Sequence, residues 1–99
     1  MNTQSFRDSV ATGDKPPAGL TPALDALWWA RKGEWPRAHA LVQEEENQEA
    51  AWVHAYLHRV EGDLANAAYW YRRAGQPMPS ASVRLDAEWE VIAAALLPS

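Results

Sequence analysis

Three glycines, Gly33, Gly62 and Gly75, divide the chain, and each follows a segment whose apolar residues recur at helical spacing. Glycine adopts the left-handed conformation that ends helices without steric cost, so each position predicts the C-terminus of a helix. Runs of alternating β-branched residues, which are typical of strands, do not occur in the sequence. The length of 99 residues is enough for one domain with a hydrophobic core. We therefore expect a single all-α domain.

The pattern of caps and breakers predicts the helix boundaries. Thr21 is a good N-cap before Pro22, and Gly62 followed by Asp63 supplies a helix end and the next N-cap. A last helix is expected to begin at a cap formed by one of the serines of residues 80–82. The expected helices cover residues 21–32, 35–43, 48–61, 64–74 and 82–97.

The first 19 residues differ from the rest in composition. They are mostly polar, contain the breaker Pro16-Pro17 and lack the apolar run of a signal peptide. We expect an irregular N-terminal leader over residues 1–19 and the helical domain over residues 20–99.

The chain contains an internal repeat with an offset of 29 residues, which aligns residues 33–38 with residues 62–67. Both copies share a small residue seven positions before the glycine, an apolar residue two positions after it and an alanine five positions after it. These residues are Ala26, Trp35 and Ala38 in the first copy and Ala55, Leu64 and Ala67 in the second, which continues through Tyr71, Ala74 and Pro79. At these positions the sequence resembles the tetratricopeptide repeat, over about residues 20–79.

That resemblance implies a tetratricopeptide-like fold of two antiparallel helix hairpins. Helical repeats cannot bury their apolar faces alone, so residues 82–97 are expected to form a capping helix. A second copy of the chain can cover the same open end, which makes a homodimer through exposed Trp side chains a further hypothesis. Residues 51–59, 62–63 and 69–75 also look like a family of short bacterial proteins, a resemblance that implies no activity.

Composition excludes several classes of function. The formal net charge is −4, and the basic residues are spread along the chain apart from Arg72 and Arg73, which opposes the neutralisation of nucleic-acid phosphates. The absence of Cys excludes disulfides, thiolate metal sites and cysteine nucleophiles, and it agrees with a cytoplasmic location. The longest apolar runs are much shorter than the roughly 20 residues of a membrane span. We expect no nucleic-acid and no membrane partner.

The six Trp side chains suggest a binding surface, because tryptophan is enriched at binding hot spots. The resemblance places Trp52, Tyr56 and Arg59 on the helix face that lines the concave groove of tetratricopeptide repeats. An aromatic floor beside a guanidinium can hold a peptide or a carboxylate. The leading hypothesis is a non-enzymatic module, without a cofactor, that binds an unidentified protein or peptide in this groove.

A different class of function is indicated by His54 and His58, which lie four residues apart and so share one helix face. His39 on the preceding helix can join them, and Glu61 can supply a carboxylate or orient an imidazole. The cluster predicts a zinc or small-molecule site, which an enzyme can use, although Ala55 stands where metalloproteases carry their glutamate. The alternative interpretation is that both histidines are partly buried, hydrogen-bonded and purely structural.

Arg72 and Arg73 end the fourth expected helix, where positive charge complements the helix dipole. They can also form an anion site with Arg59, because guanidinium groups clamp phosphate or carboxylate in a bidentate way. A purely structural subunit is the third hypothesis for the whole chain.

Overall fold

The computed structural model describes residues 1–98, and within them all regular structure is helical. The helices are α1 (Thr3–Thr12), α2 (Pro22–Lys32), α3 (Trp35–Val42), α4 (Gln48–Glu61), α5 (Leu64–Ala74) and α6 (Leu85–Leu96). The all-α class is thus confirmed, and α2 to α5 lie where the sequence predicts helices.

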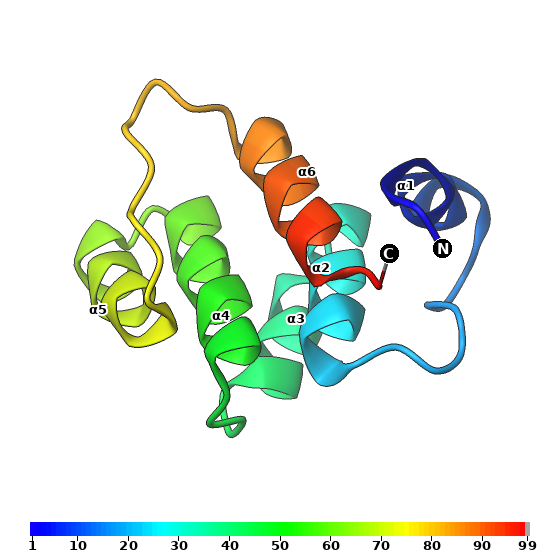
Figure 1. The fold of residues 1–99 in the computed structure, drawn as a ribbon, viewed down its shortest axis with the longest axis horizontal. Coiled ribbons are helices and arrows are strands. Elements are labelled where there is room, and N and C mark those ends of the chain that lie inside the picture. The colour runs from blue at the N-terminus through cyan, green and yellow to red at the C-terminus, as the bar shows by residue number, and fades with distance from the viewer. Residues whose placement is uncertain (99) are drawn as a thin grey trace.

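Successive helices form two hairpins, α2 with α3 and α4 with α5. Gly33 and Gly62 make the sharp turns, with φ of 90° and 86° in the left-handed region that other residues avoid. Figure 1 shows α4 between α5 and the α2–α3 pair, with α6 beside α4 and in front of α2, and α6 contacts both of these helices. The last helix therefore covers both hairpins, as a capping helix does. The closer likeness to tetratricopeptide packing stays a prediction.

The expectation of an irregular leader over residues 1–19 is wrong for its first part, which forms α1. The side chain of Asn2 caps this helix by accepting a hydrogen bond from a backbone N–H of its first turn, at 2.8 Å. Phe6 and Val10 lie one turn apart and are buried, and the Phe6 ring stacks on Trp89 of α6 with 5.5 Å between centroids. Phe6 and Val10 enter the core that α2 and α6 form, and Lys32 of α2 donates to the carbonyl of Val10 at 2.8 Å, so apolar and polar contacts together dock this mostly polar helix.

The last helix begins at Leu85 rather than at residue 82, and neither expected serine caps it. The hydroxyls of Ser80 and Ser82 lie 2.8 Å apart and bond to each other. Arg59 of α4 donates to the backbone carbonyls of Ser80, at 3.4 Å, and Val83. These bonds hold the connection between α5 and α6 in a non-helical path, so the helix starts only after it.

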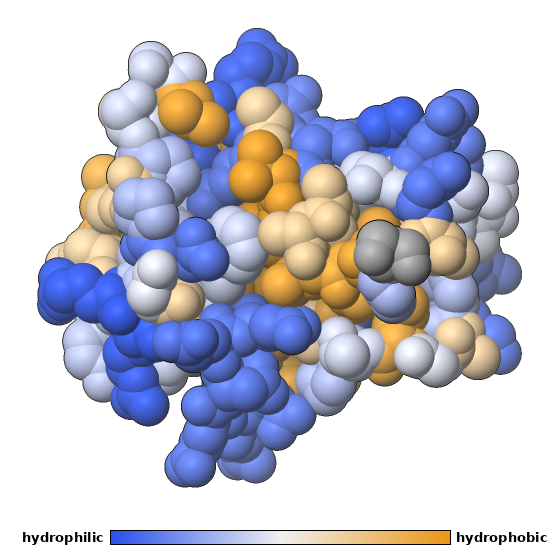
Figure 2. Space-filling model, viewed as in Figure 1, coloured by the Kyte–Doolittle hydropathy of each residue, from blue (hydrophilic) through white to orange (hydrophobic). Residues whose placement is uncertain are grey.

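Indole groups from α2 and α6 form the centre of the core. Trp28 and Trp89 are 0% and 1% exposed, yet each satisfies its N–H group. The Nε1 of Trp89 donates to the carbonyl of Leu27 at 2.8 Å, and that of Trp28 to the hydroxyl of Ser9 at 3.0 Å. Figure 2 shows apolar residues across the middle of the face that carries α6, with hydrophilic residues around them. Within residues 1–98, no helix combines the length and the hydropathy that a membrane crossing requires.

Candidate metal centre

All three histidines of the chain come together beside α4. His39 is supplied by α3, and His54 and His58 by α4. One ring nitrogen from each histidine can be taken so that the three nitrogens all lie within 4.8 Å of one another. The Nε2 atoms of His39 and His54 are 3.0 Å apart, and the rings of His54 and His58 have centroids 4.9 Å apart. The structure thus assembles the histidine cluster that the sequence spacing predicts.

Neighbouring indoles set the planes of two of these imidazoles. Trp35 fixes α3 against α4, because its Nε1 donates to the carbonyl of Leu57 at 2.7 Å. The same ring stacks on His39 with 4.7 Å between centroids. From α5, Trp70 stacks on His54 with 3.9 Å between centroids. The cluster is therefore positioned by side chains from three helices.

Burial and hydrogen bonding differ among the three rings. His54 is 4% exposed, His58 is 9% exposed, and His39 is half-buried. The Nδ1 of His58 lies 2.6 Å from a carboxylate oxygen of Glu61, three residues along the same helix. His54 and His58 are thus buried and hydrogen-bonded, and Glu61 is placed to orient His58, while a purely structural role for both histidines stays a prediction. Because Glu61 is bonded to Nδ1, Nε2 is the nitrogen of His58 that remains available to bind a metal ion.

The surroundings keep two of the rings uncharged. Burial, together with smaller effects of the nearby His39 and His58, lowers the pKa of His54 to about 4. Burial also lowers the pKa of His39, helped by His58 and opposed by the charge of Glu61. Both imidazoles are neutral at pH 7, the state in which imidazole offers a lone pair to a metal ion.

The three ring nitrogens lie within 4.8 Å of one another, so a zinc ion bound by all three requires the side chains to adjust. With Zn–N bonds of about 2.0–2.1 Å, a tetrahedral ion sets its nitrogen ligands about 3.3 Å apart. The Nε2 atoms of His39 and His54 are 3.0 Å apart in a hydrogen bond, so an ion between them would replace the hydrogen that one of them carries. The Nδ1 of His54 is buried without a hydrogen-bond partner. No bond on that side therefore resists an in-plane rotation of the ring against Trp70.

A second group of possible ligands adjoins the first, formed by His58, Glu61 and Asp63. Its two carboxylates already have other roles. Glu61 is bonded to His58, and Asp63 caps α5 by accepting from the backbone N–H of Asn66 at 3.2 Å and from its amide at 2.7 Å. These bonds to Asn66 lower the pKa of Asp63. The group therefore supports His58 and the start of α5.

The groove expected at Trp52, Tyr56 and Arg59 is largely filled by the chain itself. The Arg59 side chain is 8% exposed and donates to Glu88 of α6 at 2.8 Å. Tyr56 is buried, and burial together with the charge of Glu88 raises its pKa to about 12. The hydroxyl of Tyr71 donates to the other carboxylate oxygen of Glu88. The expectation of an open groove with a free guanidinium is corrected, because α6 occupies that face.

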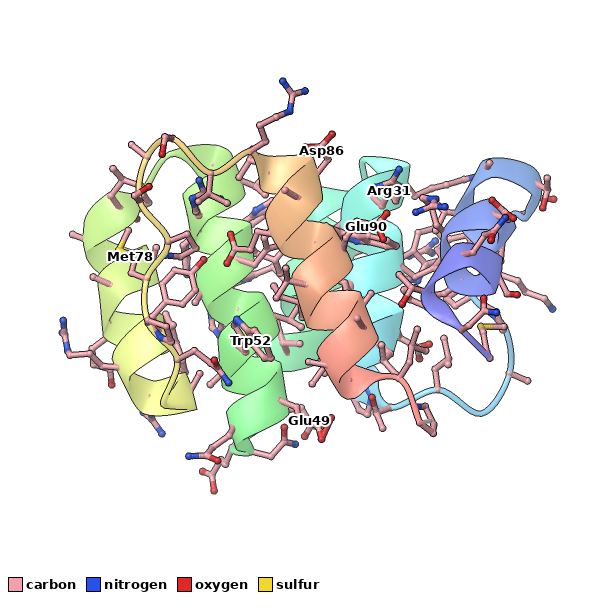
Figure 3. The ribbon with its side chains drawn as sticks, turned by 45° about the horizontal axis from the view of Figure 1, so that its top comes forward. Arg31, Glu49, Trp52, Met78, Asp86 and Glu90 are labelled. Carbon is pink, nitrogen blue, oxygen red and sulfur yellow. The ribbon has the colours of Figure 1, made fainter. Side chains whose placement is uncertain are left out.

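Trp52 alone of the three stays partly exposed. It lines a hollow of about 280 Å³ between α4, α6 and the connection that precedes α6. In Figure 3, Trp52 stands on α4 next to α6, and Met78 lies on that connection. The other apolar walls are Pro77, Pro79, Val83 and Val91. Its single charged lining residue is Glu88, which is already paired with Arg59.

The structure does not bring Arg59, Arg72 and Arg73 together into the expected anion site. Arg72 and Arg73 are exposed. Arg73 donates to the hydroxyl of Tyr69 at 3.1 Å, and its guanidinium lies 5.1 Å from the centroid of the Trp70 ring. Because Arg59 is bonded to Glu88, its guanidinium is not free to clamp an anion together with Arg72 or Arg73.

Three residues that shape these sites were not singled out for these roles from the sequence. Trp35 lies four residues before His39, and this spacing is a local signal that the two rings share a face. Trp70 and Glu88 reach His54 and Arg59 from other helices, so no local spacing marks them.

Comparison of the chain with protein-family models, with curated proteins and with solved structures finds no match. The arguments for function therefore start from the side chains. Three imidazoles, two of them held neutral, converge on one point beside an orienting carboxylate. This is the donor set that zinc and neighbouring transition metals prefer.

Proposed function

We propose that the protein binds a divalent transition-metal ion, with zinc as the first choice, through His39, His54 and His58. The observation that carries the proposal is the convergence of one ring nitrogen from each histidine within 4.8 Å of the others. An i, i+4 pair on one helix is common in helical proteins. A third imidazole that arrives from another helix at 3.0 Å is a much stronger signal of a ligand set.

The environment of His58 supports the same proposal. Imidazoles that bind metal ions usually donate their second ring N–H to a carboxylate, which fixes the ring and raises its basicity. Glu61 stands in that position at 2.6 Å. The same carboxylate adds a negative charge near the ion, which offsets part of the cost of placing a cation among half-buried side chains.

Titration of metal-stripped protein with Zn²⁺, followed by calorimetry, tests the proposal. We expect one ion per chain and a rise in melting temperature with Zn²⁺, because an ion that binds only the folded state stabilises it. The variant His39→Gln should lose the binding and still fold, since this ring is only half-buried. Glu49→Gln, which changes an exposed carboxylate at the start of α4, is the matched control. Absence of Zn²⁺ binding, or equal binding by His39→Gln, contradicts the proposal.

A second candidate function is a narrower form of peptide binding, favoured by the hollow beside Trp52. Its walls are apolar, and its one charged residue is neutralised by Arg59, so the hollow suits an uncharged apolar side chain of a partner peptide. Trp52→Ala should abolish the change in tryptophan fluorescence on titration with short apolar peptides while sparing the melting temperature. No response of the unmodified protein to any such peptide counts against this function. The cytoplasmic location and a bacterial family remain predictions from the sequence.

A further inference from the structure

The His39–His54–His58 centre offers three protein ligands and no fourth. Among the His, Asp and Glu side chains of residues 1–98, only these three bring ligand atoms mutually within 4.8 Å around this point. Zinc in proteins is most often four-coordinate, and sites with three protein ligands complete the set with water or a substrate. The number of ligands that the chain supplies therefore bears on what the centre does.

The two nearest carboxylates cannot easily fill the vacant position. Glu61 is bonded to Nδ1 of His58, and Nδ1 and Nε2 face opposite directions from the ring. An ion on Nε2 of His58 would thus lie on the other side of the imidazole from this carboxylate. Both oxygens of Asp63 accept hydrogen bonds from Asn66 at the start of α5, which ties that carboxylate to the helix cap.

The walls of the centre supply no ligand either. Trp35 and Trp70 cover the faces of His39 and His54, and an indole offers only an N–H donor. The N–H of Trp35 is already used on the carbonyl of Leu57. Both indoles and His39 are half-buried, so solvent reaches the edge of the cluster.

We infer that the centre, once loaded as proposed above, keeps one coordination position for an exchangeable ligand from solvent, a water molecule or a small anion. This inference rests on the proposed metal function. A divalent ion held by three neutral imidazoles keeps its full positive charge, which favours an anion in the open position. The ligand class is therefore a small monodentate anion that coordinates through nitrogen or oxygen. A water molecule in that position would be acidified by the ion, as in catalytic zinc sites.

Cobalt substitution makes the open position visible, because Co²⁺ takes the place of Zn²⁺ and has a visible spectrum that depends on its ligands. Metal-stripped protein is titrated with Co²⁺ to one equivalent, and sodium azide is then added with sodium chloride at equal ionic strength in a parallel sample. We expect a visible band on Co²⁺ addition and a saturable shift of that band with azide. The variant Glu61→Gln should bind Co²⁺ more weakly and show the same azide shift.

The outcomes separate the two proposals. Absence of a visible band at one equivalent of Co²⁺ overturns the metal site itself. A band that azide leaves unchanged overturns the open position and leaves the metal site standing. An azide shift that appears only in Glu61→Gln also overturns it, because Glu61 would then be the fourth ligand. Co²⁺-dependent dimerisation in sedimentation, with no azide shift, would assign the fourth ligand to a second copy of the chain and overturn the inference as well.

Discussion

The carboxylate of Glu61 lies 2.6 Å from Nδ1 of His58, one helical turn away on α4. The contact engages Nδ1 of His58 and leaves Nε2 as the other ring nitrogen, and the Glu61 side chain is 37% exposed. We predict that Glu61→Gln weakens Zn²⁺ binding about tenfold, the lower end of the usual effect of such supporting partners. Competition with a chelating dye measures the change, and Glu49→Gln, on the same helix, should bind as the unmodified protein does. Equal affinity of Glu61→Gln would mean that the carboxylate does not support the centre.

The pair Arg59 and Glu88 joins α4 to the capping helix, with side chains 8% and 4% exposed. We predict that Arg59→Met destabilises the fold by about 3–5 kcal/mol, because it leaves the Glu88 carboxylate buried without its cation. Urea unfolding measures the loss. The double variant Arg59→Met with Glu88→Leu should recover much of it, since no buried charge is then left unpaired.

An exposed ion pair provides the control for that experiment. Arg84 and Asp86 are 82% and 60% exposed at a distance of 3.2 Å, so Arg84→Met should leave the unfolding midpoint unchanged. A similar loss in Arg84→Met and Arg59→Met would show that burial does not set the strength of the Arg59 pair.

Local signals in the sequence predict most of the helices and part of the candidate site. Thr21 and Gly33 cap the two ends of α2 by hydrogen bonds to residues of that helix. The four-residue spacing of His54 and His58 is equally local. The filled groove is not predictable in this way, because Arg59 bonds to a residue that lies 29 positions later in the chain. The acidic side chain that pairs with Arg59 is determined by how α6 packs against α4.

The N-terminal helix α1 carries two local signals in a segment whose composition predicts an irregular leader. Asn2 is a strong N-cap residue, and Phe6 and Val10 are spaced one turn apart. The rest of the segment is polar, so a helix there is stable only when docked on the core. Its burial depends on the ring of Trp89 from the other end of the chain.

The docking of α1 on Trp89 predicts that truncating the Phe6 side chain strongly lowers the stability of the fold. Phe6 is 0% exposed between α1 and Trp89, so Phe6→Ala should cost about 3 kcal/mol of unfolding free energy, from lost burial and the cavity left behind. Urea unfolding measures it. Ser5→Ala, an exposed substitution on the same helix, is the control and should have little effect. Unchanged stability in Phe6→Ala would mean that α1 contributes nothing to the folded state.

The histidine cluster predicts how the metal-free protein responds to acid. The pKa of His54 is about 4 in the folded state against 6.5 for a free histidine, so between these values the unfolded chain binds more protons and stability rises with pH. The stabilisation is complete above about pH 6.5 and is lost on acidification, by about 2–3 kcal/mol between pH 7 and 4.5. The lowered pKa of His39 acts in the same direction. Unfolding in urea with a chelator present, at several pH values, measures the slope. His54→Leu should flatten it, and an equal slope in that variant would place the acid sensitivity elsewhere.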